Sequence, residues 1–159
     1  MRSFVGSLAG SMMSAMKKVC KFLRFSPMER RLLIRAVLLV GAVRLGLWVL
    51  AFERLRNLLV RVRQRSVERN GSDQVSVDEI VWAVTLASRY VPRATCLTQA
   101  LAGQVLLARW GHRVELFIGV ARGPAGSLEA HAWLESCGRV VIGDLVNLSR
   151  YIAFPSLKW

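Results

Sequence analysis

The change of periodicity at Gly111 constrains the fold more than any other feature of this sequence. Before it, Ser76-Val77-Asp78-Glu79 matches a capping box ahead of the amphipathic run IVWAVTLASRYV, which predicts a helix of about three turns ending at Pro92. A second helix is predicted from about Thr95 to Trp110, because its apolar residues recur at helical spacing. After Gly111 the period becomes that of extended strands.

Three extended segments follow. Residues 114–122 (VELFIGVAR) are rich in β-branched and aromatic side chains, which predicts a strand. Residues 129–136 and 139–144 predict two shorter strands, joined by a hairpin turn at Cys137-Gly138. Residues 147–159 indicate no element of their own. Helices followed by an antiparallel sheet predict an α+β domain.

Positive charge is concentrated in the first part of the chain. The net charge is +13 over 159 residues, yet residues 1–70 hold 15 Lys and Arg against 3 acids, and residues 71–159 hold 8 against 7. With 53% hydrophobic residues the chain has enough apolar surface for one folded domain, which excludes a disordered protein. We therefore expect three parts: residues 1–25 without a predicted element, a basic helical segment over 26–70, and the core domain over 71–159.

The basic segment contains a long helix, predicted over residues 28–69 after the start signal Ser26-Pro27 and interrupted only by Gly41 and Gly46. Its middle is apolar over the length of a membrane span, but Arg44 lies near the centre. A central arginine costs roughly 2.5–3.5 kcal/mol in a bilayer, so we expect a packed or membrane-surface helix and not a spanning one.

A run of arginines follows on the same predicted helix, and its simplest interpretation is a solvated face. The alternatives are contact with anionic lipid or with an acidic peptide. Nucleic acid is not expected, because no recognition motif accompanies the arginines. The run consists of Arg54, Arg56, Arg61, Arg63, Arg65 and Arg69.

Three cysteines are too few and too widely spaced for a disulfide framework or a Cys-x-x-Cys metal site. This predicts no metal site and a reducing, cytoplasmic setting, with membrane association left open by the basic helix. Cys20 and Cys137 are interpreted as incidental. Cys96 follows Thr95 at the start of a predicted helix, where free N–H groups and the positive end of the helix dipole favour a thiolate. The alternative for Cys96 is a small buried hydrophobic residue.

Two histidines are available as a catalytic base. His112 lies in the turn after the second helix, where an exposed loop residue is expected. His131 lies inside a strand, either as a core histidine bonded to a backbone carbonyl or as a base. If residue 136 pairs with 139 across the turn, His131 lies opposite Asp144, with Cβ atoms about 4.5–5.5 Å apart.

A slip of one residue would move Asp144 to the other face of the sheet. In the expected register, Cys96, His131 and Asp144 match the nucleophile, base and orienting carboxylate of a cysteine enzyme. The backbone N–H of Cys96 is a natural donor to an oxyanion.

Several blocks of the sequence occur together in a known family. They are Cys96-Leu97-Thr98-Gln99-Ala100-Leu101-Ala102, Leu116-Phe117-Ile118-Gly119-Val120 and Ala130-His131-Ala132-Trp133-Leu134-Glu135, with Ser26-Pro27 and Glu29-Arg30-Arg31-Leu32-Leu33 in front. In this order they resemble the transglutaminase-like B2 proteins of lasso peptide biosynthesis, over about residues 26–151. The resemblance implies a papain-like or transglutaminase-like core, with a catalytic cysteine at a helix N-terminus packed on an antiparallel sheet.

The resemblance also implies an activity: a cysteine peptidase that removes the leader from a ribosomally made lasso peptide precursor. Cys96 would be the nucleophile, His131 the base and Asp144 the third member, with no cofactor. The implied partners are the leader peptide, a separate winged-helix recognition protein and a macrolactam cyclase. Two alternatives remain open: a transglutaminase or amidase that uses the same three residues, and a non-catalytic scaffold. The scaffold would dock to a membrane or to partner proteins through residues 28–69.

Overall fold

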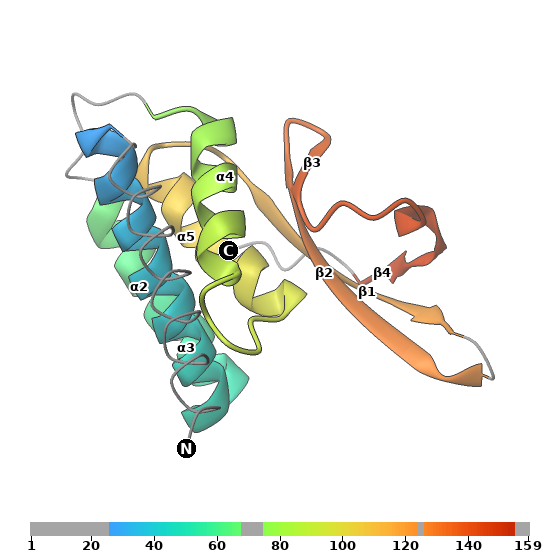
Figure 1. Cartoon of the computed structure of the whole chain (residues 1–159). Coiled ribbons are helices and arrows are strands. Elements are labelled where there is room, and N and C mark those ends of the chain that lie inside the picture. The colour runs from blue at the N-terminus through green and yellow to red at the C-terminus, as the bar shows by residue number, and fades with distance from the viewer. Residues whose placement is uncertain (1–25, 68–74, 124–125, 155–159) are drawn as a thin grey trace, which may run out of the picture.

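The computed structural model describes residues 26–67, 75–123 and 126–154 (Figure 1). The expectations for residues 1–25, which include Cys20, and for the boundary between residues 70 and 71 fall on residues outside the described part. Within the described part, four helices are followed by a four-stranded sheet. The predicted α+β class is confirmed.

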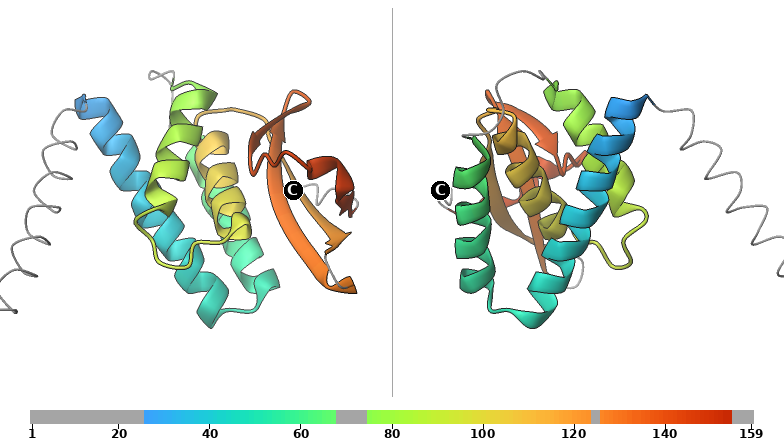
Figure 2. Two further views of the ribbon diagram at one scale, coloured as in Figure 1. Left: turned by 45° about the vertical axis from the view of Figure 1, so that its right-hand side comes forward. Right: turned by 90° about the vertical axis from the view of Figure 1, so that its left-hand side faces the viewer.

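The basic segment forms two helices, α2 (Pro27–Val49) and α3 (Phe52–Val67). The single helix predicted over 28–69 is therefore wrong at its centre. Leu50 takes an extended conformation (φ −108°, ψ 147°), and its N–H still bonds to the carbonyl of Gly46. The break lets α3 fold back beside α2 and pack against α5, which a continuous helix could not do (Figure 2).

The next two helices begin at the predicted caps. Helix α4 (Val77–Ser88) starts with the reciprocal box between Ser76 and Glu79, and α5 (Cys96–Arg109) starts at Thr95. In α4, hydrogen bonds from Ser76 lower the pKa of the Glu79 carboxyl below its ordinary value of 4.5. One of them is donated by the Ser76 N–H to the Glu79 carboxylate at 2.8 Å. Helix α5 lies at the centre of the domain and is buried over most of its length.

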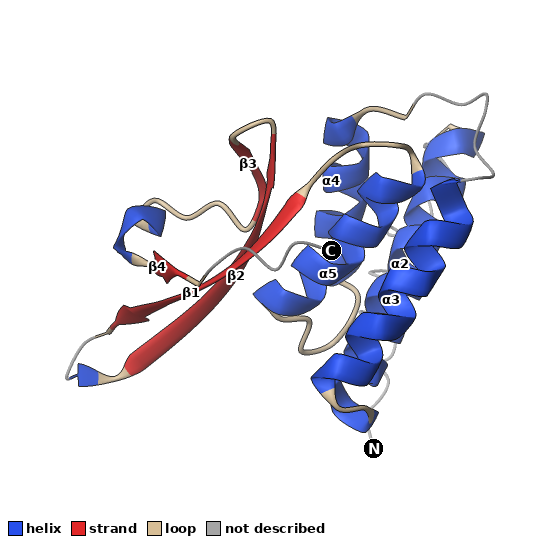
Figure 3. Cartoon of the chain, turned by 180° about the vertical axis from the view of Figure 1, so that it is seen from behind, coloured by secondary structure: helices blue, strands red, loops and turns tan. Residues whose placement is uncertain are grey.

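An antiparallel sheet in the order β3-β2-β1-β4 covers one side of the helices (Figure 3). Its strands are β1 (Glu115–Arg122), β2 (Leu128–Ser136), β3 (Arg139–Ile142) and the short β4 (Ile152–Ala153). The predicted strands at 114–122 and 129–136 and the turn at Cys137-Gly138 are confirmed. The third strand ends two residues earlier than predicted, and β4 with the 3-10 helix η2 (Leu148–Arg150) lies in the tail where no element was predicted.

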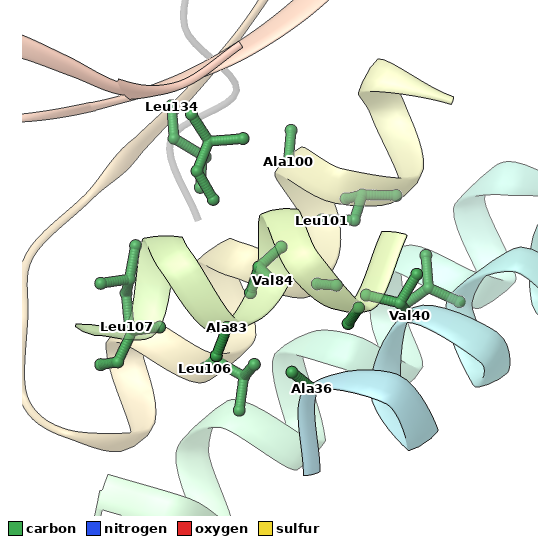
Figure 4. Packing of buried hydrophobic residues seen from close by; sticks show 14 of the residues in the cluster. Ala36, Val40, Ala83, Val84, Ala100, Leu101, Leu106, Leu107 and Leu134 are labelled. Atoms are coloured by element: carbon green, nitrogen blue, oxygen red, sulfur yellow. The ribbon is translucent and has the colours of Figure 1, made fainter. Parts of the chain in front are cut away.

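One hydrophobic core joins the helices and the sheet. Figure 4 shows Leu134 of β2 directed toward the helices, with residues of α2, α4 and α5 beneath it. Ala36 and Val40 of α2 belong to this core and are fully buried. The basic segment thus shares its packing with the rest of the domain. Helix α2 is long and apolar enough to cross a membrane by length and composition, with 33% of its apolar window buried in the protein.

Candidate active site

Cys96 is the first residue of the central helix. Its neighbour Thr95 caps the helix: each of Thr95 and Thr98 donates its backbone N–H to the other's hydroxyl at 3.4 Å, and the two hydroxyls lie 3.1 Å apart. The Cys96 thiol is half-buried. No acidic residue lies in the first turn of α5, whereas α2 and α4 each have a glutamate there, Glu29 and Glu79. The cysteine therefore lies at the positive end of a helix dipole that no first-turn carboxylate offsets.

His131 lies in the middle of β2, opposite Gly119 of β1. Side chains alternate along a strand, and the even-numbered neighbours Ala132 and Leu134 belong to the core beneath the helices. His131 therefore projects from the other face of the sheet. There its ring stacks on Trp133 with centroids 6.3 Å apart and planes 14° apart.

The imidazole is held by the connection between β3 and β4, which crosses this outer face. Nε2 of His131 lies 2.7 Å from the carbonyl oxygen of Gly143. A carbonyl only accepts hydrogen bonds, so Nε2 carries the proton in this bond and Nδ1 of the neutral ring has the free lone pair. The geometry thus selects the tautomer in which Nδ1 is the basic nitrogen.

The same connection is tied to β2 by a polar cluster beside His131. Arg150 donates to the carboxylate of Glu129, and the hydroxyl of Tyr151 lies 3.3 Å from the same carboxylate. Arg150 also donates to the Tyr151 hydroxyl at 3.2 Å, and this bond raises the pKa of Arg150 above its ordinary value. The Tyr151 ring lies 5.5 Å from the His131 ring at 46°. His131 is therefore enclosed by Trp133 on one side and Tyr151 on another.

The register predicted to place Asp144 opposite His131 is wrong. Residue 136 does pair with 139 and 135 with 140, but Leu134 pairs with Ile142, so the strand carries a bulge that shifts the register by one residue. Strand β3 then ends at Ile142, and Gly143, not Asp144, meets the imidazole. Asp144 is exposed and makes no hydrogen bond or ion pair with the described residues.

His112 differs from its prediction as an exposed loop residue. It is half-buried, and its Nε2 lies 2.7 Å from the carbonyl oxygen of Val75, which links the end of α5 to the start of α4. A helix of 14 residues separates it from Cys96, which is about 21 Å at 1.5 Å per residue. His112 is therefore too far from Cys96 to act with its thiol, and its bond to Val75 is a structural one.

The structure does not join the thiol to the imidazole. Helix α5 begins close to β2 (Figures 1 and 3), but Cys96 packs with the helix side of the core, whereas His131 projects from the opposite face. No hydrogen bond joins these two described residues. Among the described strands, β3 pairs with β2 only at Leu134, Glu135 and Ser136. At the level of His131, β2 therefore has no ladder partner on its β3 side, and the chain at Gly143 lies against it instead.

Four residues of this site were not singled out from the sequence: Gly143, Glu129, Arg150 and Tyr151. Their contacts with His131 and with one another depend on the path of the chain after β3. The sequence carries one local signal of that path, the Gly143-Asp144 pair, since glycine permits the left-handed turn that directs the chain across the sheet. Among the described residues, no group of three His, Cys, Asp or Glu side chains could hold a metal ion.

The fold is thus a central helix that begins with a cysteine and packs on an antiparallel sheet carrying a histidine. A family model described as the transglutaminase-like superfamily matches residues 36–154, and the chain belongs to this superfamily, whose members are typically cysteine-dependent enzymes. The match includes α3 and most of α2 as well as the sheet. No curated protein and no solved structure matches the chain.

Proposed function

We propose that this protein is a cysteine peptidase that removes the leader peptide from a ribosomally made lasso peptide precursor before the macrolactam ring closes. The observation that carries the proposal is the position of Cys96, half-buried at the start of the central helix of a transglutaminase-like domain. Superfamily membership supports a cysteine-dependent enzyme. The finer assignment rests on the resemblance of the Cys96, Leu116 and His131 blocks to the B2 proteins.

In the proposed reaction, the Cys96 thiolate attacks the carbonyl carbon at the end of the leader. The oxyanion that forms accepts a hydrogen bond from the Cys96 backbone N–H at the helix terminus. His131 gives a proton to the departing amine, which becomes the N-terminus of the core peptide, and a thioester joins the leader to Cys96. His131 then takes a proton from water, and the hydroxide hydrolyses the thioester to release the leader with a free carboxylate.

The state of His131 supports its role as the base. With Nε2 held by the Gly143 carbonyl, Nδ1 is the nitrogen that would accept the thiol proton. The thiol and imidazole lie on opposite sides of the sheet without substrate, so this transfer requires that substrate binding bring them within hydrogen-bond reach around the edge of β2. We propose Asp144 as the third member. The carbonyl of its neighbour Gly143 accepts the hydrogen bond from the His131 ring. A shift of residues 143–144 would therefore replace this carbonyl with the Asp144 carboxylate as the acceptor.

The test is leader release by the full chain. The protein is incubated with a precursor peptide, the winged-helix recognition protein and the cyclase, and the products are analysed by mass spectrometry. We expect leader and core fragments with the wild type and none with Cys96→Ala or His131→Ala, while Asp144→Asn lowers the rate. Cys137→Ala is the matched control, because Cys137 is an exposed turn residue, and it should cleave like the wild type.

Each other outcome has a definite meaning. Cleavage by Cys96→Ala would exclude Cys96 as the nucleophile. A deamidated or cross-linked peptide that depends on Cys96 would instead identify an amidase or a transglutaminase. An unmodified precursor would favour the scaffold alternative if Cys96 also alkylates at an ordinary rate between about pH 5 and 8, with and without partners.

A further inference from the structure

The outward face of α2 is apolar along most of the helix. Its large side chains on this face are 49–79% exposed, and alanine and glycine fill the positions between them; a Cβ at Gly41 would meet nothing within 4 Å. The spacing of three, four and seven residues places these positions along one side of the helix. We call this set the outer stripe: Ile34, Leu38, Gly41, Ala42, Leu45, Trp48 and Val49.

The opposite face of α2 is buried in the hydrophobic core. Leu33, Ala36, Val40 and Val43 are at most 5% exposed and pack into the core with α4 and α5. A helix that is apolar on all sides is normally buried on all sides, and contiguous exposed apolar surface marks a contact site. Because its inner face is buried in the core, α2 can contact a further apolar partner, such as a protein surface or a bilayer, only along the outer stripe.

The chemistry of the stripe favours lipid over protein. Its only hydrogen-bonding side chain is the indole of Trp48, whereas protein interfaces carry about one hydrogen bond per 100–200 Å². Acyl chains require none. Tryptophan is also the side chain enriched at the boundary between acyl chains and headgroups.

Charge agrees with this assignment. Arg31 and Arg35 are exposed at the N-terminal end of the stripe, and residues 27–67 hold nine arginines against two glutamates, a net charge of +7. Basic residues beside an apolar helix face attract it to anionic headgroups. We propose that the outer stripe docks this protein on the surface of an anionic bilayer, with α2 lying in the plane of the membrane.

Docking in this orientation would leave the candidate active site open to solution. Helices α4 and α5 lie between α2 and the sheet, and the β3–β4 connection over His131 lies on the far side (Figures 1 and 2). A peptide could therefore reach the side of the sheet that carries His131 while the protein is bound to a membrane. The docking proposal does not depend on the reaction assigned to Cys96.

The experiment is co-sedimentation of the full chain with lipid vesicles. We expect binding to vesicles of phosphatidylglycerol and phosphatidylcholine, weaker binding at high salt, and much less binding to phosphatidylcholine alone. The double variant Leu38→Glu/Leu45→Glu should bind at least tenfold more weakly, and Leu38→Ser/Leu45→Ser should show a smaller loss in the same direction. Leu128→Glu is the matched control, because Leu128 is 79% exposed on the sheet, and it should bind like the wild type.

Circular dichroism verifies that each variant is folded, as expected for positions 59% and 69% exposed. The proposal is overturned if the wild type does not sediment with anionic vesicles, or if Leu128→Glu weakens binding as much as the stripe variants do. It is also overturned if size-exclusion chromatography shows a dimer that the stripe variants abolish while vesicle binding is absent. The stripe would then be an interface between two copies of the chain.

Discussion

Replacing Gly143 with alanine tests how the chain is held across the sheet above His131. Gly143 has a φ of 82°, a left-handed conformation that costs an L residue about 1–2 kcal/mol. A Cβ there would also lie 2.7 Å from the carbonyl oxygen of Ala132 and 3.0 Å from the Cβ of Trp133. Neither atom can swing aside as the tip of a flexible side chain would, so the overlap should add about 1–3 kcal/mol.

Gly138 provides the matched control for this substitution. Its φ is 75°, but a Cβ at Gly138 would meet nothing within 4 Å, so Gly138→Ala should cost only the conformational part, about 1–2 kcal/mol. The difference between the two variants isolates the contact of Gly143 with β2. Urea unfolding followed by circular dichroism measures both free energies, and each 1 kcal/mol should lower Tm by about 2–4 °C in a domain of this size.

A second measurement links the substitution to the site. In the wild type, ¹⁵N NMR of the His131 ring should show the proton on Nε2, and Gly143→Ala should weaken this preference because the carbonyl is displaced. Leader release should fall with it. Equal destabilisation by Gly143→Ala and Gly138→Ala, or an unchanged His131 tautomer, would refute the close contact between Gly143 and β2.

Three further changes test the fold around the site. Leu134→Ala should lower the free energy of unfolding by about 2–5 kcal/mol in urea unfolding, since Leu134 is fully buried between β2 and α5. Leu128→Ala, on the exposed part of the same strand, should change this free energy by less than about 0.5 kcal/mol. Thr95→Ala should lower the free energy of unfolding by about 1 kcal/mol because it removes the cap of α5, and Thr95→Ser should retain most of this stability. Equal losses in both variants would show that the hydroxyl does not stabilise the helix. Because the pKa of Glu79 is lowered in the folded state, its cap on α4 stabilises the protein above about pH 4.5 and is lost as the pH falls through the folded-state value. The stability difference between wild type and Ser76→Ala, measured at several pH values, should therefore shrink below pH 4.5, and a constant difference would contradict this.

The starts of α4 and α5 were predictable because their signals are local. A Ser or Thr cap, its partner three residues later and the apolar period after it all lie within one or two turns of helix. The strands at β1 and β2 and the hairpin at Cys137-Gly138 were predictable for the same reason. Cys96 could therefore be placed at a helix N-terminus from the sequence alone.

The features that were missed depend on contacts between distant residues. Residues 28–69 have continuous helical character, and only the packing of α3 on α5 explains the break at Leu50. The bulge opposite Leu134 and Glu135 has no turn-like residues to mark it, so a uniform register was the natural prediction. That single extra residue removes Asp144 from the position opposite His131, and the left-handed turn at Gly143, directly after β3, brings the Gly143 carbonyl to the ring. The tail strand β4 has two residues, too few for a periodic pattern.

The neutral cap on α5 has an electrostatic consequence for any anion formed beside Cys96. In α2 and α4 the first turn contains a glutamate that occupies the positive end of the helix, so another negative charge arriving there would be repelled. At α5 the same hydrogen bonds are made by two threonine hydroxyls, which carry no charge. The helix is capped against fraying, and its terminus remains vacant for a negative charge supplied by the reaction.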